Sequence, residues 1–490
     1  MAARVLRATQ PPQLFLDRQL NTHIIITTIR NNNTAILHAA FAAWNAASHL
    51  RTRRERNKRF TYGDQWGDTS LDSSGRRISD WDRYNKEGHP PITNNVLRQL
   101  VKSIVGRFRS QYLDKATQQG GGKPAGTAEL DELDARLLEE FLISGVCLQR
   151  VDLVHDLLEK HTQVSNVNVN RFFINTIADP LARDCEIVGQ VHDLSVAALI
   201  KQVAAGSRRK AAWVRRLYSE DVEARTASLA TALGADSQSG THFWYCPTGK
   251  CRAIEVWTLE SHEVLTCHNR ATSQVFVAPL GQLKKLKSNP DMSVNWDIAT
   301  TWHCRWFSPM GDLLAEYDSP YRHGSHPYVM RFYPLTDGEI HSFIEDMIDQ
   351  QKLVNRLVTM VDHVMNSSAK GVLLYPENAM PDGFTWSQVR QVWRSCDGVL
   401  PYNPQLGEAK PEQISTNNTN FGAYPMIELQ LKMLEHISGV SGALRGQNVD
   451  TRGSSTLYQT QADNAAIALA DIFDTFNAFR QSRQAKLARL

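Results

Sequence analysis

The stretch from Pro425 to the C-terminus places a glycine-rich, charged loop between two helical segments, and it constrains the fold more than any other part of the chain. Pro425 suits the first turn of a helix, because its missing N–H has no acceptor there. The apolar positions that follow recur at helical spacing: Ile427, Leu431, Leu434 and Ile437. Glycines between positions 439 and 453 then end any regular element before a final helix predicted over 455–490.

The loop itself contains Arg445, Asp450 and Arg452, which have no apolar neighbours to pack against. A charged loop held between two amphipathic helices suits contact with a channel or a polyanion. It is a poor catalytic centre, because catalytic groups need rigid support.

Composition excludes several classes of protein. Apolar residues make up 42% and charged residues 21% of the 490 positions, as in soluble globular proteins of roughly two to four domains. The net charge of +3 is too mild for a general nucleic-acid surface, so any such surface must be local. Seven scattered cysteines indicate a reducing compartment rather than a disulfide framework. No apolar run approaches the ~20 residues of a membrane span, and no secretory signal is evident.

Periodicity predicts an α+β chain, in which a mixed block (1–336) precedes two long helices that flank a small αβ insert. Helices are predicted over 34–59, 94–109, 131–144, 195–205, 210–217, 339–366, 386–395 and 424–438. Strands are predicted over 146–154, 164–169, 172–180, 188–192, 243–245, 253–259, 263–267, 275–278, 300–307, 313–317, 328–333, 372–375 and 398–400.

The first predicted helix ends in a strongly basic run, which includes Arg51, Arg53, Arg54, Arg56, Lys58 and Arg59. One interpretation is a solvated helix end, where cations are favoured by the helix dipole. The other is contact with nucleic acid or with an acidic neighbouring subunit.

Metal and catalytic motifs are weak. Cys246 and Cys251 have the spacing of a zinc hairpin that Cys267 and His268 would complete, although buried cysteines beside a turn are the plainer interpretation. Asp80 and Asp82 form an isolated carboxylate pair that could bind a divalent ion. A metal-dependent nuclease would use these carboxylates or the Cys246/Cys251 pair. The Gly120–Lys123 segment lacks the phosphate-loop pattern. We therefore predict no enzyme, no cofactor and no metal.

Several segments together resemble the portal proteins of tailed bacteriophages, especially those of short-tailed (podovirus-type) phages. The segments that carry the resemblance are Arg59-Phe-Thr-Tyr-Gly-Asp-Gln-Trp66, Gly88-His-Pro-Pro-Ile-Thr-Asn-Asn95 with Val105-Gly106, Leu133-Asp-Ala135 through Gly145, Val188–Ser195, Ser325-His-Pro-Tyr328, Gln350–Asn355, and Ile437–Gly446 with the helix start at Ser455–Gln461. Each is weak alone, but their order over about residues 50–480 is specific.

The resemblance implies a portal fold and its layout. Residues 1–336 correspond to the wing, with 1–33 as an irregular arm. Residues 337–366 and 423–440 correspond to the stem helices, 367–422 to the clip, 441–454 to the tunnel loop and 455–490 to a helix returning to the wing. The DNA-facing residues are then expected in the tunnel loop and on the first stem helix: Leu444, Arg445, Gln447, Asn448, Asp450, Arg452, Lys352 and Arg356.

The resemblance also implies the protein's partners. Portal proteins are rings of twelve subunits at one capsid vertex of the virion, assembled in the host cytoplasm, through which double-stranded DNA is packaged and ejected. The expected partners are other copies of the chain, DNA, the terminase, head-to-tail adaptors, and the major capsid and scaffold proteins, with no membrane. A DNA-processing nuclease and another virion structural protein remain the alternatives.

One departure from the family concerns the end of the chain. Portals of this type usually continue into a crown, whereas this sequence stops within the basic segment from Arg480 to Arg489. We expect either a minimal crown or a shortened form.

Overall fold

The computed structural model describes residues 33–72, 74–86, 90–118, 127–155, 160–218, 243–247, 249–270, 272–289, 291–336, 338–368, 372–394, 399–403, 410–414, 423–440, 467 and 469–490. The chain divides into two compact units. The first contains residues 1–55, 120–342 and 471–490, and the second contains residues 56–119 and 343–470. This division differs from the predicted block of 1–336, since 56–119 group with the two long helices.

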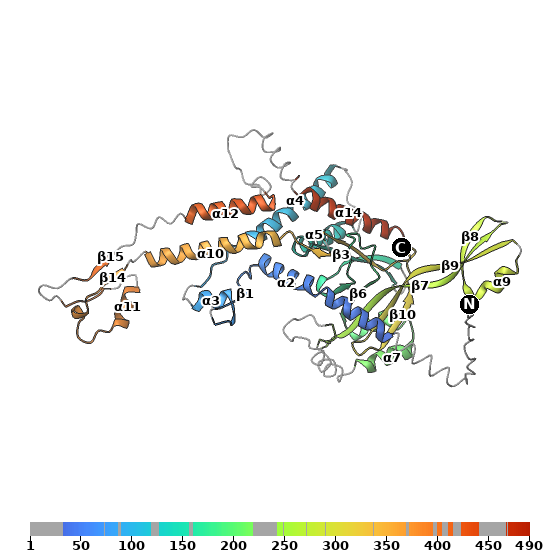
Figure 1. Ribbon diagram of the computed structural model, residues 1–490, viewed down its shortest axis with the longest axis horizontal. Helices are drawn as coiled ribbons and strands as arrows, with labels where there is room; N and C mark the ends of the chain where they lie inside the picture. The colour runs from blue at the N-terminus through green and yellow to red at the C-terminus, as the bar shows by residue number, and fades with distance from the viewer. Residues whose placement is uncertain are drawn as a thin grey trace, which may run out of the picture. The chain divides into compact units, whose positions relative to one another are not determined.

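The first unit is built around an antiparallel sheet with the strand order β10-β9-β7-β6-β5, in which β8 pairs with β7 (Figure 1). Its strands are β5 (Phe172–Ile174), β6 (Ile187–Leu194), β7 (Cys251–Asn269), β8 (Gln274–Pro279), β9 (Met292–Phe307) and β10 (Leu313–Asp318). β9 pairs along its whole length with residues 254–269 of β7, and the two strands extend beyond the others to a tip formed with β8 and α9 (Leu283–Lys287).

A second sheet in the same unit has the order β11-β3-β4. Its strands are β3 (Val146–His155), β4 (Lys160–Asn166) and β11 (Tyr328–Phe332), and the two-residue strands β12 (Leu335–Thr336) and β13 (Glu339–Ile340) follow. The helices of this unit are a stretch at 33–46, α5 (Thr127–Ser144), α6 (Val196–Val203), α7 (Arg208–Leu217) and α14 (Ala470–Leu487), with a short 3-10 turn, η1 (Val169–Arg171).

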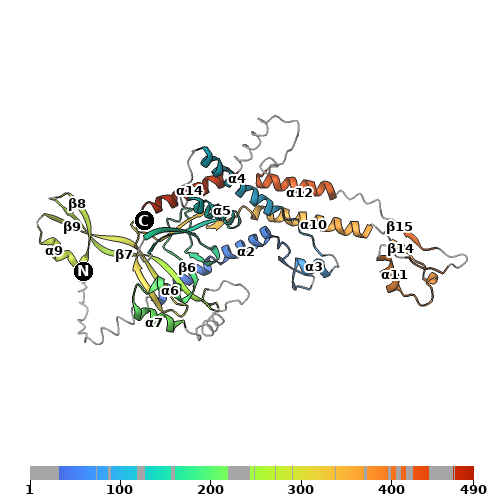
Figure 2. The same ribbon diagram turned by 180° about the vertical axis from the view of Figure 1, so that it is seen from behind.

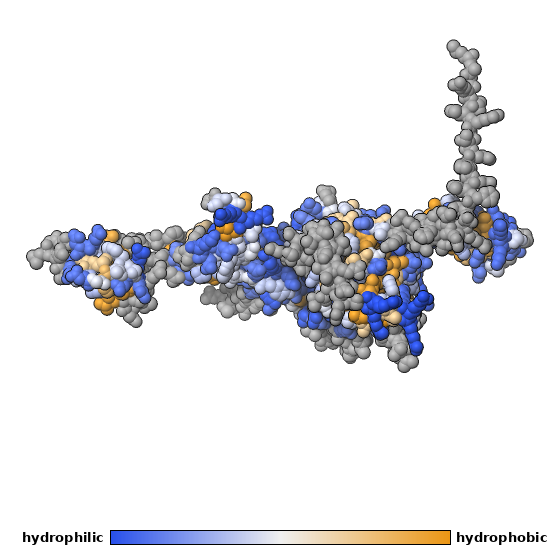
Figure 3. Space-filling model, turned by 90° about the horizontal axis from the view of Figure 1, so that it is seen from below, coloured by the Kyte–Doolittle hydropathy of each residue, from blue (hydrophilic) through white to orange (hydrophobic). Residues whose placement is uncertain are grey.

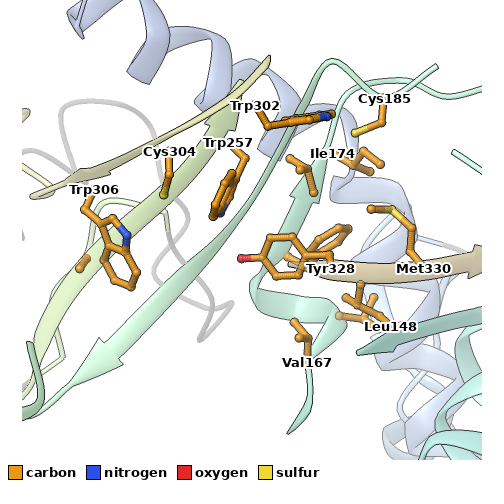
Figure 4. Close-up of a cluster of buried hydrophobic side chains, with 14 of the residues drawn as sticks. Leu148, Val167, Ile174, Cys185, Trp257, Trp302, Cys304, Trp306, Tyr328 and Met330 are labelled. Atoms are coloured by element: carbon orange, nitrogen blue, oxygen red, sulfur yellow. The ribbon is translucent and has the colours of Figure 1, made fainter. Parts of the chain in front are cut away.

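The core of the first unit lies between these two sheets. Trp257 and Trp306 extend from the larger sheet, and Tyr328 and Met330 come from β11 (Figure 4). Trp257, Trp306 and Tyr328 are among the largest fully buried side chains of the chain. Burying aromatic side chains of this size contributes roughly 1.5–3 kcal/mol each, so this cluster is a main source of the unit's stability.

A buried ion pair lies within this core. Arg150 of β3 pairs with Glu255 of β7, and Glu255 also accepts hydrogen bonds from Trp257 Nε1 at 2.8 Å and the Tyr328 hydroxyl at 3.1 Å. Burial alone would raise the pKa of the Glu255 carboxyl, but the charge of Arg150 and the bond to His192 outweigh it, and the pKa lies well below its ordinary value. The charge is therefore fully compensated inside the core.

Ion pairs with a buried aspartate hold the C-terminal helix α14 in the first unit. Asp134 of α5 is fully buried and pairs with Arg483 and, at 2.7 Å, with Arg480. Phe476 of the same helix packs on Phe141, with ring centroids 6.3 Å apart. Charge pairing and apolar packing thus act on the same helix.

The second unit is mostly helical (Figures 1 and 2). It contains the end of α2 (Ser48–Tyr62), α3 (Asp80–Lys86), α4 (Val96–Gln118), α10 (Glu345–Ser368), α11 (Trp386–Arg394) and α12 (Ala423–Ser438). The small strand pairs β1 (Thr69–Leu71) with β2 (Arg77–Ser79) and β14 (Val372–Leu374) with β15 (Glu412–Ile414) complete it, together with η3 (Glu377–Ala379).

The mixed α+β class and most predicted elements are confirmed. Ser195 is the N-cap of α6, and its hydroxyl accepts from the backbone N–H of Ala198. The cap of α4 is Asn95, since its Oδ1 accepts from the N–H of Arg98 at 3.1 Å. No helix in the described part of the chain is long and apolar enough to cross a membrane.

Other predictions are wrong in ways that local sequence explains. The two strands expected over 253–259 and 263–267 are one continuous strand, β7. The helix expected from 339 begins at Glu345, because Glu339–Ile340 form β13. Residues 243–245 and 399–400 form no strand.

Candidate functional site

Helices α10 and α12 lie side by side in the second unit (Figures 1 and 2). Met347, Ile348, Val354 and Leu357 of α10 are buried, as is Leu434 of α12. The buried residues of α10 recur at helical spacing and form one apolar stripe. On α12, the partly buried Ile427 and Leu431 lie on the same face as Leu434.

A second apolar stripe on α12 has no cover from the described residues. Met426, Leu429, Met433 and Ile437 follow at intervals of three, four and four residues, which places them on one helix face. Each has between 44% and 50% of its surface exposed. Ile437, expected on the buried face, lies on this outer stripe instead. Exposed apolar side chains in such a row mark an interaction surface.

The first half of α10 is fixed by buried amide side chains. Gln351 Oε1 accepts hydrogen bonds from the backbone N–H groups of Val96 at 3.1 Å and Leu97 at 3.3 Å, and its Nε2 donates to the carbonyl oxygen of Asn94 at 2.6 Å. Those N–H groups open α4 and have no acceptor within their own helix. Gln351 therefore caps α4 from a helix about 250 residues away along the chain.

Asn355 and Thr359 continue this arrangement one and two turns further along α10. Asn355 Oδ1 accepts from the Asn94 N–H at 2.9 Å, and the Thr359 hydroxyl oxygen accepts from the Ile92 N–H at 3.0 Å. Three segments that appear unrelated in the sequence, 59–66, 88–95 and 350–355, thus meet in one buried network. We call Gln65, Asn94, Asn95, Gln351, Asn355 and Thr359 the amide network.

A single carboxylate with three basic partners lies beside this network. Asp68 pairs with Lys352 of α10, with Arg56 at 2.9 Å and with Arg59 at 3.6 Å. Burial alone would raise the pKa of the Asp68 carboxyl, but hydrogen bonds and charge from Arg56 and Lys352 outweigh it and lower the pKa. Lys352, one of the two predicted stem cations, therefore binds a carboxylate of its own unit. The other, Arg356, is exposed.

The basic run of α2 does not form the solvated surface that its composition indicates. Arg54 binds Glu140 through two parallel hydrogen bonds of 2.7 Å. Arg51 is buried with its guanidinium 3.8 Å from the centre of the Trp44 ring, and Arg53 donates to the Ile340 carbonyl oxygen at 3.0 Å. Glu140 and Ile340 lie 86 and 287 positions away from their arginines, so composition alone gives no signal for these two contacts.

The predicted tunnel-loop residues lie outside the described part of the chain. These are Leu444, Arg445, Gln447, Asn448, Asp450 and Arg452. The structure gives only the helix that precedes them, which ends at Ser438, and Gly439 with a positive φ of 66° just after it.

The candidate metal ligands are not brought together. Cys251 and Cys267 lie 16 residues apart on the single strand β7, which is about 50 Å at ~3.3 Å per residue. His268 follows Cys267 directly and so points to the opposite face of the sheet. Cys246 and Cys251 are both buried free thiols. Among described residues, no group of three or more metal-ligating side chains is present.

The candidate nuclease carboxylates are engaged in local hydrogen bonds. Asp82 accepts from the Ser79 hydroxyl at 2.7 Å, and Asp80 accepts from the Ser70 hydroxyl at 3.4 Å. Both lie in the first turn of α3, where acidic side chains favour the helix. Their arrangement is that of a helix start.

Comparison with models of known protein families identifies a match. The model of the family described as Phage P22-like portal protein matches residues 165–490. The match begins in β4 and covers both long helices, the predicted tunnel loop after α12, and α14. No curated protein matches the chain.

Proposed function

Since the chain belongs to the phage P22-like portal protein family, we propose that its copies assemble into a ring whose central channel passes double-stranded DNA. Packaging and ejection would both use this channel. The ring would occupy one capsid vertex of the virion and bind the terminase, head-to-tail adaptors, and the capsid and scaffold proteins. The function is that of a conduit and a docking platform, with no chemical step.

The observation that carries the proposal is the outer stripe of α12. Four apolar side chains, Met426, Leu429, Met433 and Ile437, are half-exposed in a single chain. Neighbouring copies would cover them in a ring. In a closed ring each subunit uses two different surfaces, so the stripe requires a complementary surface elsewhere on the same chain. The exposed Leu353 and Met360 of α10 supply apolar surface of the same kind.

The layout follows from the elements. In this proposal the β-rich part of 1–336 forms the wing, α10 and α12 form the stem, and residues 367–422 form the clip. The clip contains β14, β15 and α11. Residues 441–454 form the tunnel loop, in which Arg445 and Arg452 face DNA. Each such arginine is repeated once per subunit, so a ring of subunits presents a circle of positive charges around the channel.

Negative-stain electron microscopy and mass photometry of the purified full chain test the proposal. We expect rings of uniform subunit number, near twelve, with a central opening. A protein that stays monomeric over the whole concentration range, and that does not join capsids in an infected-cell lysate, would contradict it.

A further inference from the structure

Helix α7 carries an outer face made of arginines. Arg208, Arg209, Arg215 and Arg216 are all exposed, and they lie within about 120° around the helix at 100° per residue. Ala212 lies in the middle of this arc. We call these four side chains the arginine face.

The opposite side of α7 is firmly packed. Val214 is fully buried in the core of the first unit, and Trp213 and Leu217 pack against the same cluster. Tyr218, just beyond the helix, donates a hydrogen bond to the Arg252 carbonyl oxygen. The arginine face is therefore held outward on a rigid support.

In the described part of the chain, none of the four arginines forms an ion pair with a carboxylate. The arginines of α2 behave in the opposite way, since Arg54 pairs with Glu140 and Arg56 pairs with Asp68. Within the described residues, the chain thus neutralises the basic helix α2 and provides no counter-charge to the arginine face of α7.

Two of these charges also work against the helix itself. Arg208 and Arg209 lie in the first turn of α7, which contains no acidic residue. The N-terminus is the positive end of the helix dipole, where carboxylates stabilise and cations destabilise. At this end the dipole and the two guanidinium groups therefore add to one positive potential, which an anion would relieve. Arg215 and Arg216 lie in the last turn, where the dipole favours cations.

The chemistry of the face fits a phosphate backbone. Guanidinium groups bind phosphate oxygens through paired hydrogen bonds. Arg208 and Arg215 are separated along the helix by about 10 Å, at ~1.5 Å per residue. Duplex DNA carries one charge per ~1.7 Å of its axis, so such a face meets several phosphates at once. A convex helix surface suits a long polyanion better than a small ion, which needs an enclosing pocket.

We infer that the arginine face of α7 binds the backbone of double-stranded DNA without sequence preference. Seen from below, the molecule shows a strongly hydrophilic patch on the part of the first unit where α7 lies (Figure 3). The site lies on the β-rich unit, far along the chain from the predicted tunnel loop. The inference rests on the proposed function, which brings DNA to this protein, and adds a contact surface outside the channel loop.

Fluorescence anisotropy with a labelled 30-base-pair duplex of random sequence tests the inference on the full chain. The variant replaces Arg208, Arg209, Arg215 and Arg216 with glutamine. Four phosphate contacts contribute about −3.6 to the slope of log affinity against log salt concentration. Between 50 and 200 mM salt, wild-type affinity should therefore fall about 100-fold more than that of the variant.

A matched control removes four exposed cations from the tip of the same unit, Arg270, Lys284, Lys285 and Lys287, also as glutamine. We expect the control to keep the wild-type salt slope within about one unit. An equal loss of salt slope in both variants would overturn the inference, because the change in net charge alone would then explain the effect. An unchanged slope in the α7 variant would also overturn it.

Polyglutamate of matched charge identifies the class of polyanion. If the α7 variant loses affinity for polyglutamate but keeps its affinity for DNA, the partner is an acidic protein surface and the DNA assignment is wrong. Imaging the same samples separates this result from the proposed function. Rings that form normally with an unaltered DNA slope reject only the α7 site, whereas absence of rings in the wild type rejects the portal assembly.

Discussion

Asn355 donates a hydrogen bond from Nδ2 to Oε1 of Gln65, 2.5 Å away, although 290 positions separate the two residues in the chain. Asn355 belongs to the long helix α10, and Gln65 lies just after α2. Both side chains are buried, and Gln65 also donates to the Phe60 carbonyl oxygen at 2.7 Å. The pair fixes the position of α10 within its unit through directional contacts that apolar packing alone does not provide.

Replacing Gln351 with leucine should destabilise the second unit. The change leaves the N–H group of Leu97 without an acceptor, at about 1–3 kcal/mol for a buried unsatisfied group. The Val96 N–H and the Asn94 carbonyl oxygen lose their bonds to Gln351 but stay bonded to each other at 3.0 Å. Denaturant unfolding should show a loss of about 1–3 kcal/mol. The exposed neighbour Arg356, changed to glutamine, serves as a control and should stay within ~0.5 kcal/mol of wild type. Equal stability of Gln351→Leu and wild type would show that the network is dispensable.

Charged substitutions on the outer stripe of α12 should block assembly without unfolding the chain. Leu429→Glu combined with Met433→Glu places two carboxylates where a neighbouring copy would pack. Both positions are half-exposed in the single chain, so the isolated fold should tolerate them. Mass photometry should show monomers in place of rings, with an unchanged circular dichroism spectrum. Lys432→Gln on the same helix should still assemble, and normal rings from the double variant would place the interface elsewhere.

Asp134→Asn should loosen the C-terminal helix. The substitution leaves the buried guanidinium of Arg483 without its counter-charge, and removing one partner of a buried pair typically destabilises by about 3–5 kcal/mol. Hydrogen exchange should rise across α14. Glu132→Gln, at an exposed position on the same helix, should leave exchange unchanged. Protection of α14 equal to wild type in Asp134→Asn would show that Phe476 and Phe479 hold the helix without the ion pair.

Lys486 should make stability depend on pH in the alkaline range. Burial lowers the pKa of its ammonium group from 10.5 to about 7. The unfolded chain therefore binds more protons than the folded chain between pH 7 and 10.5, so this residue raises stability as pH rises through that window. Below pH 7 the penalty for the buried charge is fully present. Lys486→Met should remove this rise, as measured by unfolding at pH 7 and pH 9.5, whereas Lys432→Met should retain it.

The tunnel-loop proposal makes a separate prediction. Arg445→Ala and Arg452→Ala should leave ring assembly intact and alter the amount of DNA packaged or retained. Packaging assays with purified capsids, read beside ring counts from microscopy, measure both quantities. Complete loss of rings in these variants would show that the loop serves assembly rather than contact with DNA.

Helix periodicity in the sequence was the most reliable guide to the fold. Regular apolar spacing located α5, α6 and α12 to within a few residues of their ends, because each buries one face. The sequence predicts two strands in place of β7 because its middle, around Ser261 and Glu263, is exposed and polar. It predicts no strand at β15 because three residues with one apolar side chain give no pattern.

The contacts at the candidate site could not be predicted from local patterns. Gln351 looks like an ordinary polar helix residue, and only the fold shows that it caps α4. The arginine-rich sequence of α2 is typical of an exposed surface patch. The carboxylates that pair with these arginines come close to them only in the folded chain. In α7 the same composition remains unneutralised by the described residues, so identical sequence signals have opposite outcomes.

The amide network has a consequence for the conditions under which this protein operates. Its members, Gln65, Asn94, Asn95, Gln351, Asn355 and Thr359, have no ionisable group. Counter-ions screen interactions between charges over about 10 Å at 0.1 M salt, but they leave buried contacts between neutral dipoles almost unchanged. Polyvalent cations and dense nucleic acid change the ionic environment greatly. The contacts that the amide network makes with α10 should therefore be much less sensitive to ions than the Asp68–Lys352 ion pair on the same helix.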